Sequence, residues 1–161
     1  KGVGALYVKE GINFERIQDG GHQERGKRAG TENVAGIVGL GKAIEIASNR
    51  IEIYNNKLLN LRNYFIDGLN NNFENIRING DVNVSFRNKD ASDILFELDK
   101  NCICASGGSA CSSGNVSPSH VLLAIGVPSE WINGTVRFTL GEENSKDEID
   151  YVLKCMKAVV I

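Results

Sequence analysis

The run Thr135-Val136-Arg137-Phe138-Thr139-Leu140 alternates polar and apolar side chains. Because successive side chains of a β-strand point to opposite faces, its three apolar residues share one face, and Thr135, Arg137 and Thr139 share the other. The alternation predicts a strand that covers a core with one face. A guanidinium fixed on a strand can offer two parallel hydrogen bonds to a carboxylate, but an arginine in this position is also commonly a solvated charge or an ion-pair partner.

The patterns around this strand indicate the fold class. Further strands are predicted at residues 76–78, 83–86 and 102–104. Helices are predicted at residues 91–99, 117–125 and 145–160. Asp90 precedes the first of these helices, and Ser145 opens the last in the capping-box pattern Ser-x-x-Glu. We expect an α+β domain whose small mixed or antiparallel sheet is covered by helices on one face.

A longer helical pattern precedes the sheet. It runs from Glu32 to about Asn71, as one helix or as two consecutive helices, because three glycines weaken its first turns. Thr31 is the predicted N-cap of this helix. The three asparagines at residues 70–72 predict a turn at its end.

The composition bounds the class of protein. The chain has 161 residues, 42% of them hydrophobic and 24% charged, which suffices for one domain with its own core. A net charge of −2 without a block of lysines and arginines gives no reason to expect binding to nucleic acid or an anionic membrane. No apolar run is long enough to span a bilayer. We expect small molecules or proteins as partners, and a reducing, cytoplasmic setting.

The four cysteines are Cys102, Cys104, Cys111 and Cys155, too few and too unevenly spaced for a disulfide framework. Cys102 and Cys104 are one residue too close for a CxxC pair, and the two histidines add no metal-binding spacing, so we expect no metal site. Cys102, Cys104 and Cys155 are interpreted as structural cysteines.

Cys111 differs from the others because it lies in Ser106-Gly107-Gly108-Ser109-Ala110-Cys111-Ser112-Ser113-Gly114-Asn115, a run of small and polar residues. A thiol there has no apolar packing and sits on a segment that can move. The pattern fits a reactive thiol, and it fits equally well a surface loop that happens to carry a cysteine.

Residues 19–33 form a polar, Gly-rich stretch with three basic side chains, and this stretch ends where the long helix is predicted to begin. Backbone N–H groups, the Thr31 hydroxyl and the helix dipole together suit a phosphate. Simple capping by Thr31, with Arg25, Lys27 and Arg28 in solvent, explains the pattern as well.

Three motifs occur in a fixed order: Gly-Gly-His-Gln-Glu-Arg-Gly-Lys-Arg-Ala-Gly-Thr-Glu-Asn, then Gly-Gly-Ser-Ala-Cys-Ser-Ser-Gly followed by Ser-Pro-Ser-His-Val-Leu, then Val-Arg-Phe-Thr-Leu-Gly. Together they resemble the C-terminal part of the pyridoxal-phosphate-dependent cysteine desulfurases of the NifS/IscS type, in the class V aminotransferase family. The resemblance covers nearly the whole chain. It implies an α/β fold, namely the C-terminal domain of a fold type I pyridoxal phosphate enzyme, preceded by one strand and a loop of the large domain.

The resemblance also implies a domain division. Residues 1–33 would be a remnant of the large domain that binds the cofactor, and residues 34–161 the small domain with its linking helix. The apolar run at residues 3–8 predicts a strand buried on both faces. Without its natural neighbours we expect this strand, with the loop at residues 20–31, to be rearranged, mobile or paired with another copy of the chain.

Three residues receive roles from the resemblance. Cys111 would be the nucleophile that takes the sulfur of L-cysteine, leaving L-alanine and a persulfide. Thr31 would reach the phosphate of pyridoxal 5'-phosphate in the other subunit of a homodimer, and Arg137 would bind the substrate carboxylate. His22 and Arg28 match the motif but receive no firm role. An iron–sulfur scaffold or another sulfur-acceptor protein would collect the sulfur.

In this family the lysine that holds the cofactor lies ahead of a Gly-Pro-Lys-Gly turn, and Lys1-Gly2 matches the end of that turn. We therefore expect the parent to be a cysteine desulfurase and this chain alone to be inactive. Two alternatives stay open. One is a relative that acts on selenocysteine or another amino acid, and the other is a non-catalytic module that binds an iron–sulfur scaffold protein.

Overall fold

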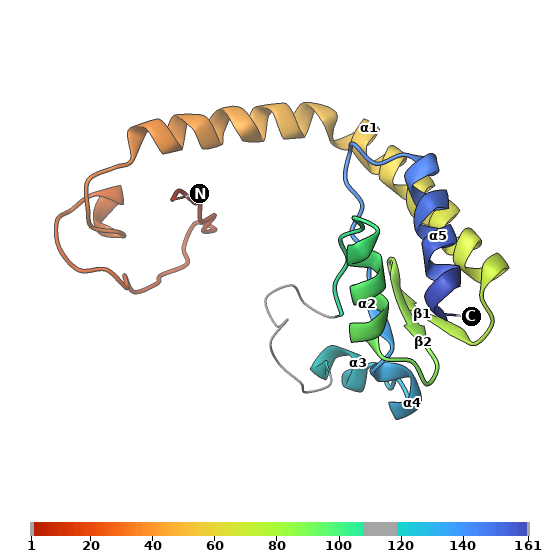
Figure 1. The fold of residues 1–161 in the computed structure, drawn as a ribbon. Helices are drawn as coiled ribbons and strands as arrows, with labels where there is room; N and C mark the ends of the chain where they lie inside the picture. The colour runs from red at the N-terminus through yellow and green to blue at the C-terminus, as the bar shows by residue number, and fades with distance from the viewer. Residues whose placement is uncertain (1, 108–118, 161) are drawn as a thin grey trace. The chain divides into compact units, whose positions relative to one another are not determined.

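The structure, a computed structural model, describes residues 2–107 and 119–160. The chain forms two compact units, unit 1 at Lys1–Glu52 and unit 2 at Ile53–Ile161. The boundary falls inside α1 (Val34–Asn72), which is one continuous helix of 39 residues (Figure 1). The two-helix form of the prediction is therefore wrong.

The N-terminus of α1 is capped by Asn33, whose Oδ1 accepts a hydrogen bond from the Gly36 N–H at 3.1 Å. An Asn side chain in this position satisfies one of the free N–H groups of the first turn. The prediction that Thr31 is the N-cap is wrong, because the helix begins two residues too late for its hydroxyl to reach those groups.

The C-terminus of α1 extends through the three asparagines for which a turn was predicted. The side chain of Asn72 donates to the Gly68 carbonyl at 2.6 Å, and the Phe73 N–H donates to the Leu69 carbonyl at 3.1 Å. These bonds supply partners to the last carbonyls of the helix, so the turn follows Asn72 instead of replacing the final turn.

Unit 2 is built on a three-stranded antiparallel sheet in the order β1-β2-β3. The strands are β1 (Ile76–Gly80), β2 (Asn83–Phe86) and β3 (Thr135–Arg137). Val84 of β2 pairs with Val136 of β3, and both side chains are fully buried. The predicted strand at residues 135–140 forms only in its first half.

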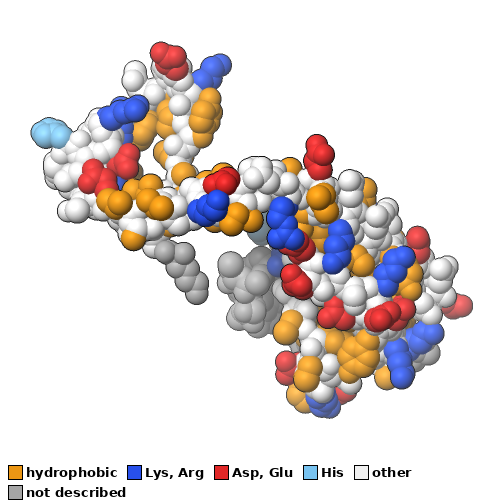
Figure 2. All heavy atoms as spheres, turned by 90° about the horizontal axis from the view of Figure 1, so that it is seen from above, with side chains coloured by type: hydrophobic (Ala, Val, Ile, Leu, Met, Phe, Trp, Pro, Cys, Tyr) orange, Lys and Arg blue, Asp and Glu red, His pale blue; other side chains and the backbone are white. Residues whose placement is uncertain are grey.

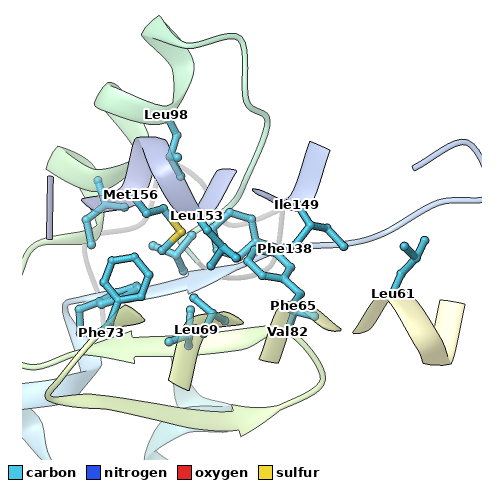
Figure 3. Packing of buried hydrophobic residues seen from close by; sticks show 14 residues of the cluster. Leu61, Phe65, Leu69, Phe73, Val82, Leu98, Phe138, Ile149, Leu153 and Met156 are labelled. Atoms are coloured by element: carbon cyan, nitrogen blue, oxygen red, sulfur yellow. The ribbon is translucent and has the colours of Figure 1, made fainter. Parts of the chain in front are cut away.

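Helices cover the apolar side of this sheet, as predicted. The second half of α1, α2 (Ala91–Lys100) and α5 (Lys146–Val160) contribute to one core with the strands. In Figure 1, α5 lies along the second half of α1, and α2 lies beside the sheet. Figure 3 shows the side chains that these helices and strands direct into the core, among them Phe65 and Phe138.

Two short helices, α3 (His120–Ala124) and α4 (Ser129–Ile132), connect α2 to β3. Leu122, Val127 and Ile132 form a small second cluster beneath them. The helix predicted at residues 117–125 is therefore shorter than expected in its described part, and its first two residues lie outside the described ranges.

The predicted caps of α2 and α5 are confirmed. Oδ1 of Asp90 accepts from the Ser92 N–H at 2.7 Å. At α5, the Glu148 N–H donates to Oγ of Ser145 at 3.3 Å, and the Ser145 N–H donates to the Glu148 carboxylate at 2.8 Å. These reciprocal bonds are the capping box that the sequence pattern predicts.

The predicted strand at residues 3–8 does not form, and most of its side chains are exposed, Tyr7 to 88%. A strand buried on both faces needs a neighbour on each side. In its described residues unit 1 contains no other strand, since the three paired strands all belong to unit 2. The run therefore has no ladder to join.

The predicted strand at residues 102–104 is also wrong, because Cys102 ends α2 in the left-handed conformation, with φ of 57°. The Cys102 N–H donates to the Asp99 carbonyl and the Ile103 N–H to the Leu98 carbonyl, each at 2.9 Å. This pair of bonds is a Schellman motif, which turns the chain away from the helix.

Charged side chains of both signs cover unit 2. Figure 2 shows Lys and Arg interspersed with Asp and Glu over the face in view. Neither sign dominates that face, in keeping with a net charge of −2. Within the described ranges, no helix has the length and apolar character needed to cross a membrane.

Phe65 is central to the core, so its truncation should strongly reduce stability. It is 1% exposed and packs edge-on against Phe138 with ring centroids 5.1 Å apart. We expect Phe65→Ala to lower the free energy of unfolding by about 3–5 kcal/mol, because the lost ring leaves a cavity. Urea unfolding followed through the fluorescence of Trp131 measures it. Phe96→Ala, at a position 60% exposed, is the matched control, and an equal loss there would contradict this assignment of the core.

The capping box predicts a pH dependence. The backbone N–H of Ser145 and the side chain of Asn144 donate to Glu148, which lowers the pKa of Glu148 below its usual 4.5. Its contribution to stability is therefore present above pH 4.5 and is lost as the pH falls through the lowered pKa. We expect Glu148→Ala to lower the Tm at neutral pH and to match the unchanged chain in acid. Glu143→Ala, outside α5, is the control that should show no such convergence.

Candidate active site

Arg137, the last residue of β3, is the centre of the candidate site in unit 2. Because Val136 faces the core, the alternation of the strand places Arg137 on the opposite, polar face. Asn83 of β2 pairs with it on one side. On the other side, the Arg137 N–H donates to the Ser106 carbonyl at 2.7 Å and the Ser106 N–H donates back at 3.1 Å. The main chain of Arg137 is thus held from both edges.

The guanidinium of Arg137 has a donor without an acceptor. Its Nε is buried and has no hydrogen-bond partner among the described residues. Buried donors are normally paired, and a guanidinium cannot lose its proton to avoid the cost. An external carboxylate, which accepts two parallel hydrogen bonds from a guanidinium, would supply the missing acceptor.

The polar face around Arg137 carries amides, hydroxyls and a second guanidinium, and its described strand residues include no carboxylate. These residues are Arg77, Asn79, Asn83, Ser85 and Thr135. Without an internal anion, this face is suited to receive one from outside.

Cys111 follows Ser106 by five residues and lies outside the described residues. The bridge between Ser106 and Arg137 fixes where the segment that leads to Cys111 starts, at the outer edge of β3. Unit 2 therefore brings Arg137 together with the beginning of the Cys111 segment. Thr31 belongs to the other compact unit, unit 1.

Thr31 is exposed and follows Gly30, which has φ of +104°. A Cβ at Gly30 would lie 2.9 Å from Nη1 of Arg28, so the guanidinium rests against the bare backbone of this glycine. The Gly30 N–H already donates to Oε1 of Gln23 at 3.2 Å. A guanidinium and a hydroxyl that both neighbour Gly30 are donors that fit a phosphate, including the phosphate of pyridoxal phosphate.

The other cysteines are not core residues. Cys102 and Cys104 are exposed, and Cys155 of α5 is half-buried beside Tyr151. A hydrogen bond with Cys155 raises the pKa of the Tyr151 hydroxyl. Cys102 and Cys104 therefore lie at the surface, because the Schellman turn directs that segment out of the core.

The comparison with family models identifies the class of protein that has this fold. The model described as Aminotransferase class-V matches residues 1–152, so the chain belongs to this family. The chain is 46% identical over 170 residues to the cysteine desulfurase IscS of Clostridium botulinum (strain Hall) and 45% identical over 168 residues to a cysteine desulfurase of Trichormus azollae. Both matches cover 99% of this chain, which spans 43% and 42% of the length of those relatives.

Solved structures give the same result. A NifS-like protein matches with a TM-score of 0.79 at 31% identity, over 95% of this chain and 40% of that one. A NifS-like protein from Rickettsia africae matches with a TM-score of 0.77 at 26% identity, over 92% of this chain and 40% of its own. The family and fold class that the motifs indicate are therefore confirmed.

Sequence reasoning did not single out Ser85 and Ser106, and it placed Thr135 on the strand face of Arg137 without giving it a role. The alternation at residues 83–86 and 135–140 was a usable signal, since it already places Ser85 and Thr135 on the polar faces of their strands. The pairing of the two strands, which brings these hydroxyls together, is not written in either strand alone.

Gly134, directly before β3, generates a prediction for this site. A Cβ there would lie 2.1 Å from the Phe86 carbonyl oxygen, so the two backbones could not keep their approach. We expect Gly134→Ala to lower the free energy of unfolding by about 1–3 kcal/mol or more, measured by urea unfolding. Gly141→Ala is the control, because the nearest atom to its new Cβ would be 3.7 Å away. Equal stability of the two variants would show that β3 does not need this close approach.

Proposed function

We propose that the protein to which this chain belongs is a pyridoxal-phosphate-dependent cysteine desulfurase, which converts L-cysteine into L-alanine and a persulfide on Cys111. The observation that carries the proposal is Arg137, whose buried Nε lacks an acceptor and whose main chain pairs with Ser106, five residues before Cys111. A receptor for a carboxylate beside the start of a thiol-bearing segment is what a thiol that acts on an amino acid requires.

Arg137 would orient the substrate by its α-carboxylate. Its planar guanidinium accepts only a narrow set of carboxylate positions, so binding also sets where the thiol of the bound cysteine lies. Cys111, as a thiolate, would then attack that sulfur. The S–S bond forms as the C–S bond of the substrate breaks, the electron pair of the broken bond stays on carbon, and protonation there gives L-alanine.

Thr31, with Arg28 beside it, would hold the cofactor phosphate of a second copy in a homodimer. Pyridoxal phosphate, when bound, supplies the electron withdrawal that allows the C–S bond to break. The chain spans about two fifths of its relatives' length, and we place the lysine that holds the cofactor in the remainder. Residues 1–33 would then belong to the cofactor-binding domain, residues 34–161 to the small domain, and the chain alone would be inactive.

The persulfide on Cys111 would pass its outer sulfur to an acceptor protein, such as an iron–sulfur scaffold protein. Two relatives are named cysteine desulfurases, and an enzyme that removes sulfur from cysteine needs an acceptor for that sulfur. The acceptor's thiolate would attack the outer sulfur, and the thiolate of Cys111 would be the leaving group, which restores the enzyme.

The test compares the chain preceded by its cofactor-binding segment with the same protein carrying Cys111→Ser. We expect both proteins to show the visible absorbance of bound pyridoxal phosphate. With a thiol reductant present, which frees the outer sulfur of the persulfide as sulfide, release of alanine and sulfide from cysteine should fall by more than about a hundredfold in the variant, because the nucleophile is gone.

Cys104→Ser is the matched control, since Cys104 is an exposed cysteine of the same unit and should be dispensable. The 161-residue chain assayed alone should release neither product. Full release by Cys111→Ser, or a colourless extended protein, would overturn the proposed function.

A further inference from the structure

A continuous chain of side-chain hydrogen bonds crosses the polar face of the sheet beside Arg137. Nε of Arg77 donates to Oδ1 of Asn79 at 3.2 Å. Nδ2 of Asn79 donates to Oδ1 of Asn83 at 3.0 Å and to Oγ of Ser85 at 2.7 Å. The Ser85 hydroxyl lies 2.7 Å from the Thr135 hydroxyl. These bonds join all three strands.

The direction of this chain is set by its two ends. The Arg77 guanidinium can only donate, and the far end is the Trp131 carbonyl, which can only accept and lies 3.2 Å from Oγ1 of Thr135. Thr135 therefore gives its proton to Trp131 and accepts from Ser85. Ser85 in turn accepts from Asn79. Each hydroxyl therefore accepts one hydrogen bond and donates one in a fixed direction. The orientation of the Asn79 amide follows from its bonds to Arg77 and Ser85.

The two hydroxyls at the centre of the chain are buried, Ser85 to 0% and Thr135 to 1% exposure. Loss of the Thr135 hydroxyl would leave the buried O–H of Ser85 without an acceptor in a place that water does not reach, which costs more than an exposed hydrogen bond would. Loss of the Ser85 hydroxyl would remove the donor of Thr135 and an acceptor of Asn79. The sheet therefore depends on both hydroxyls to keep β2 and β3 in register.

The chain also engages the polar groups that flank Arg137. Asn83 is the pairing partner of Arg137 on β2, and its Oδ1 accepts from Asn79. Thr135 lies two residues before Arg137 on the same face, and its hydroxyl is committed to Ser85 and Trp131. Neither side chain accepts a hydrogen bond from Nε of the guanidinium, which has no partner among the described residues.

We propose that Ser85 and Thr135 are positioning residues for Arg137, which hold its strand in register and keep its neighbours engaged so that its donors stay available to a carboxylate. That the carboxylate belongs to an amino-acid substrate rests on the proposed function. Carboxylate binding by a correctly positioned Arg137 does not, and it can be tested separately.

The first experiment uses the 161-residue chain and acetate as the carboxylate probe. The Nε–H resonance of Arg137 is followed by NMR, with that of Arg77, which is bonded to Asn79, as the internal reference. We expect acetate to shift the Arg137 resonance in the unchanged chain. In Thr135→Val the shift at the same acetate concentration should be lost, and in Thr135→Ser, which keeps the hydroxyl, it should return.

The second experiment uses the extended enzyme and kinetics. Thr135→Val should raise the KM for L-cysteine about tenfold, because a displaced guanidinium loses a charge-assisted hydrogen bond to the carboxylate, with a smaller change in kcat. The inhibition constant of cysteamine, an aminothiol without a carboxylate, should stay within about twofold, since it makes no use of Arg137. Thr139→Val, on an exposed side chain just beyond β3, is the control. If Thr135→Val fails to fold, Ser85→Ala replaces it.

The outcomes separate the two proposals. Loss of the acetate shift in Thr135→Val supports the positioning role even if the extended protein does not release alanine, which would overturn the proposed function alone. An acetate shift unchanged by Thr135→Val, no acetate shift in the unchanged chain, or equal changes for cysteine and cysteamine would overturn the positioning role.

Discussion

The pairing of β2 with β3 brings two valines together in the core and, one position along, two hydroxyls together on the polar face. Val84 and Val136 meet in the core, while Ser85 and Thr135 share a hydrogen bond of 2.7 Å on the other side of the sheet. Because side chains alternate, a slip of β3 by one residue would turn Thr135 toward the apolar core and Val136 toward the polar face. The helices that cover the apolar side and the arginine on the polar side both depend on this single register.

The sequence predicts what short-range chemistry decides. Asp90 and the pair Ser145–Glu148 form their caps with groups at most three residues away, so the pattern alone contains every partner. The strand face of Arg137 follows in the same way, because alternation depends only on the order of residues. The three motifs that indicate the family are likewise contiguous stretches of sequence.

Long-range partners decide the features that the sequence does not predict. The apolar run at residues 3–8 reads as a central strand, but strand formation needs neighbours that its own residues do not specify. Asn33 caps α1 in place of Thr31 because the helix starts at Val34, and both residue types are good caps. Cys102 takes the left-handed conformation at a position where glycine is usual, so the residue type there gives no sign that the helix ends in a turn.

Arg137 depends both on the local alternation of its strand, which sets its face, and on distant residues, which hold its main chain. It is also an exception to the rule that buried donors are paired. Its main chain is held by Ser106 on one side and by the strand of Asn83 on the other, so the backbone is over-determined while Nε stays without an acceptor among the described residues. Satisfying that nitrogen internally would have needed only one acidic residue on the polar face. Each polar neighbour there is instead an amide, a hydroxyl or a guanidinium already engaged elsewhere. The unpaired Nε therefore costs the fold some stability, which a bound carboxylate would restore. The backbone pairing on both sides of Arg137 keeps that nitrogen in place.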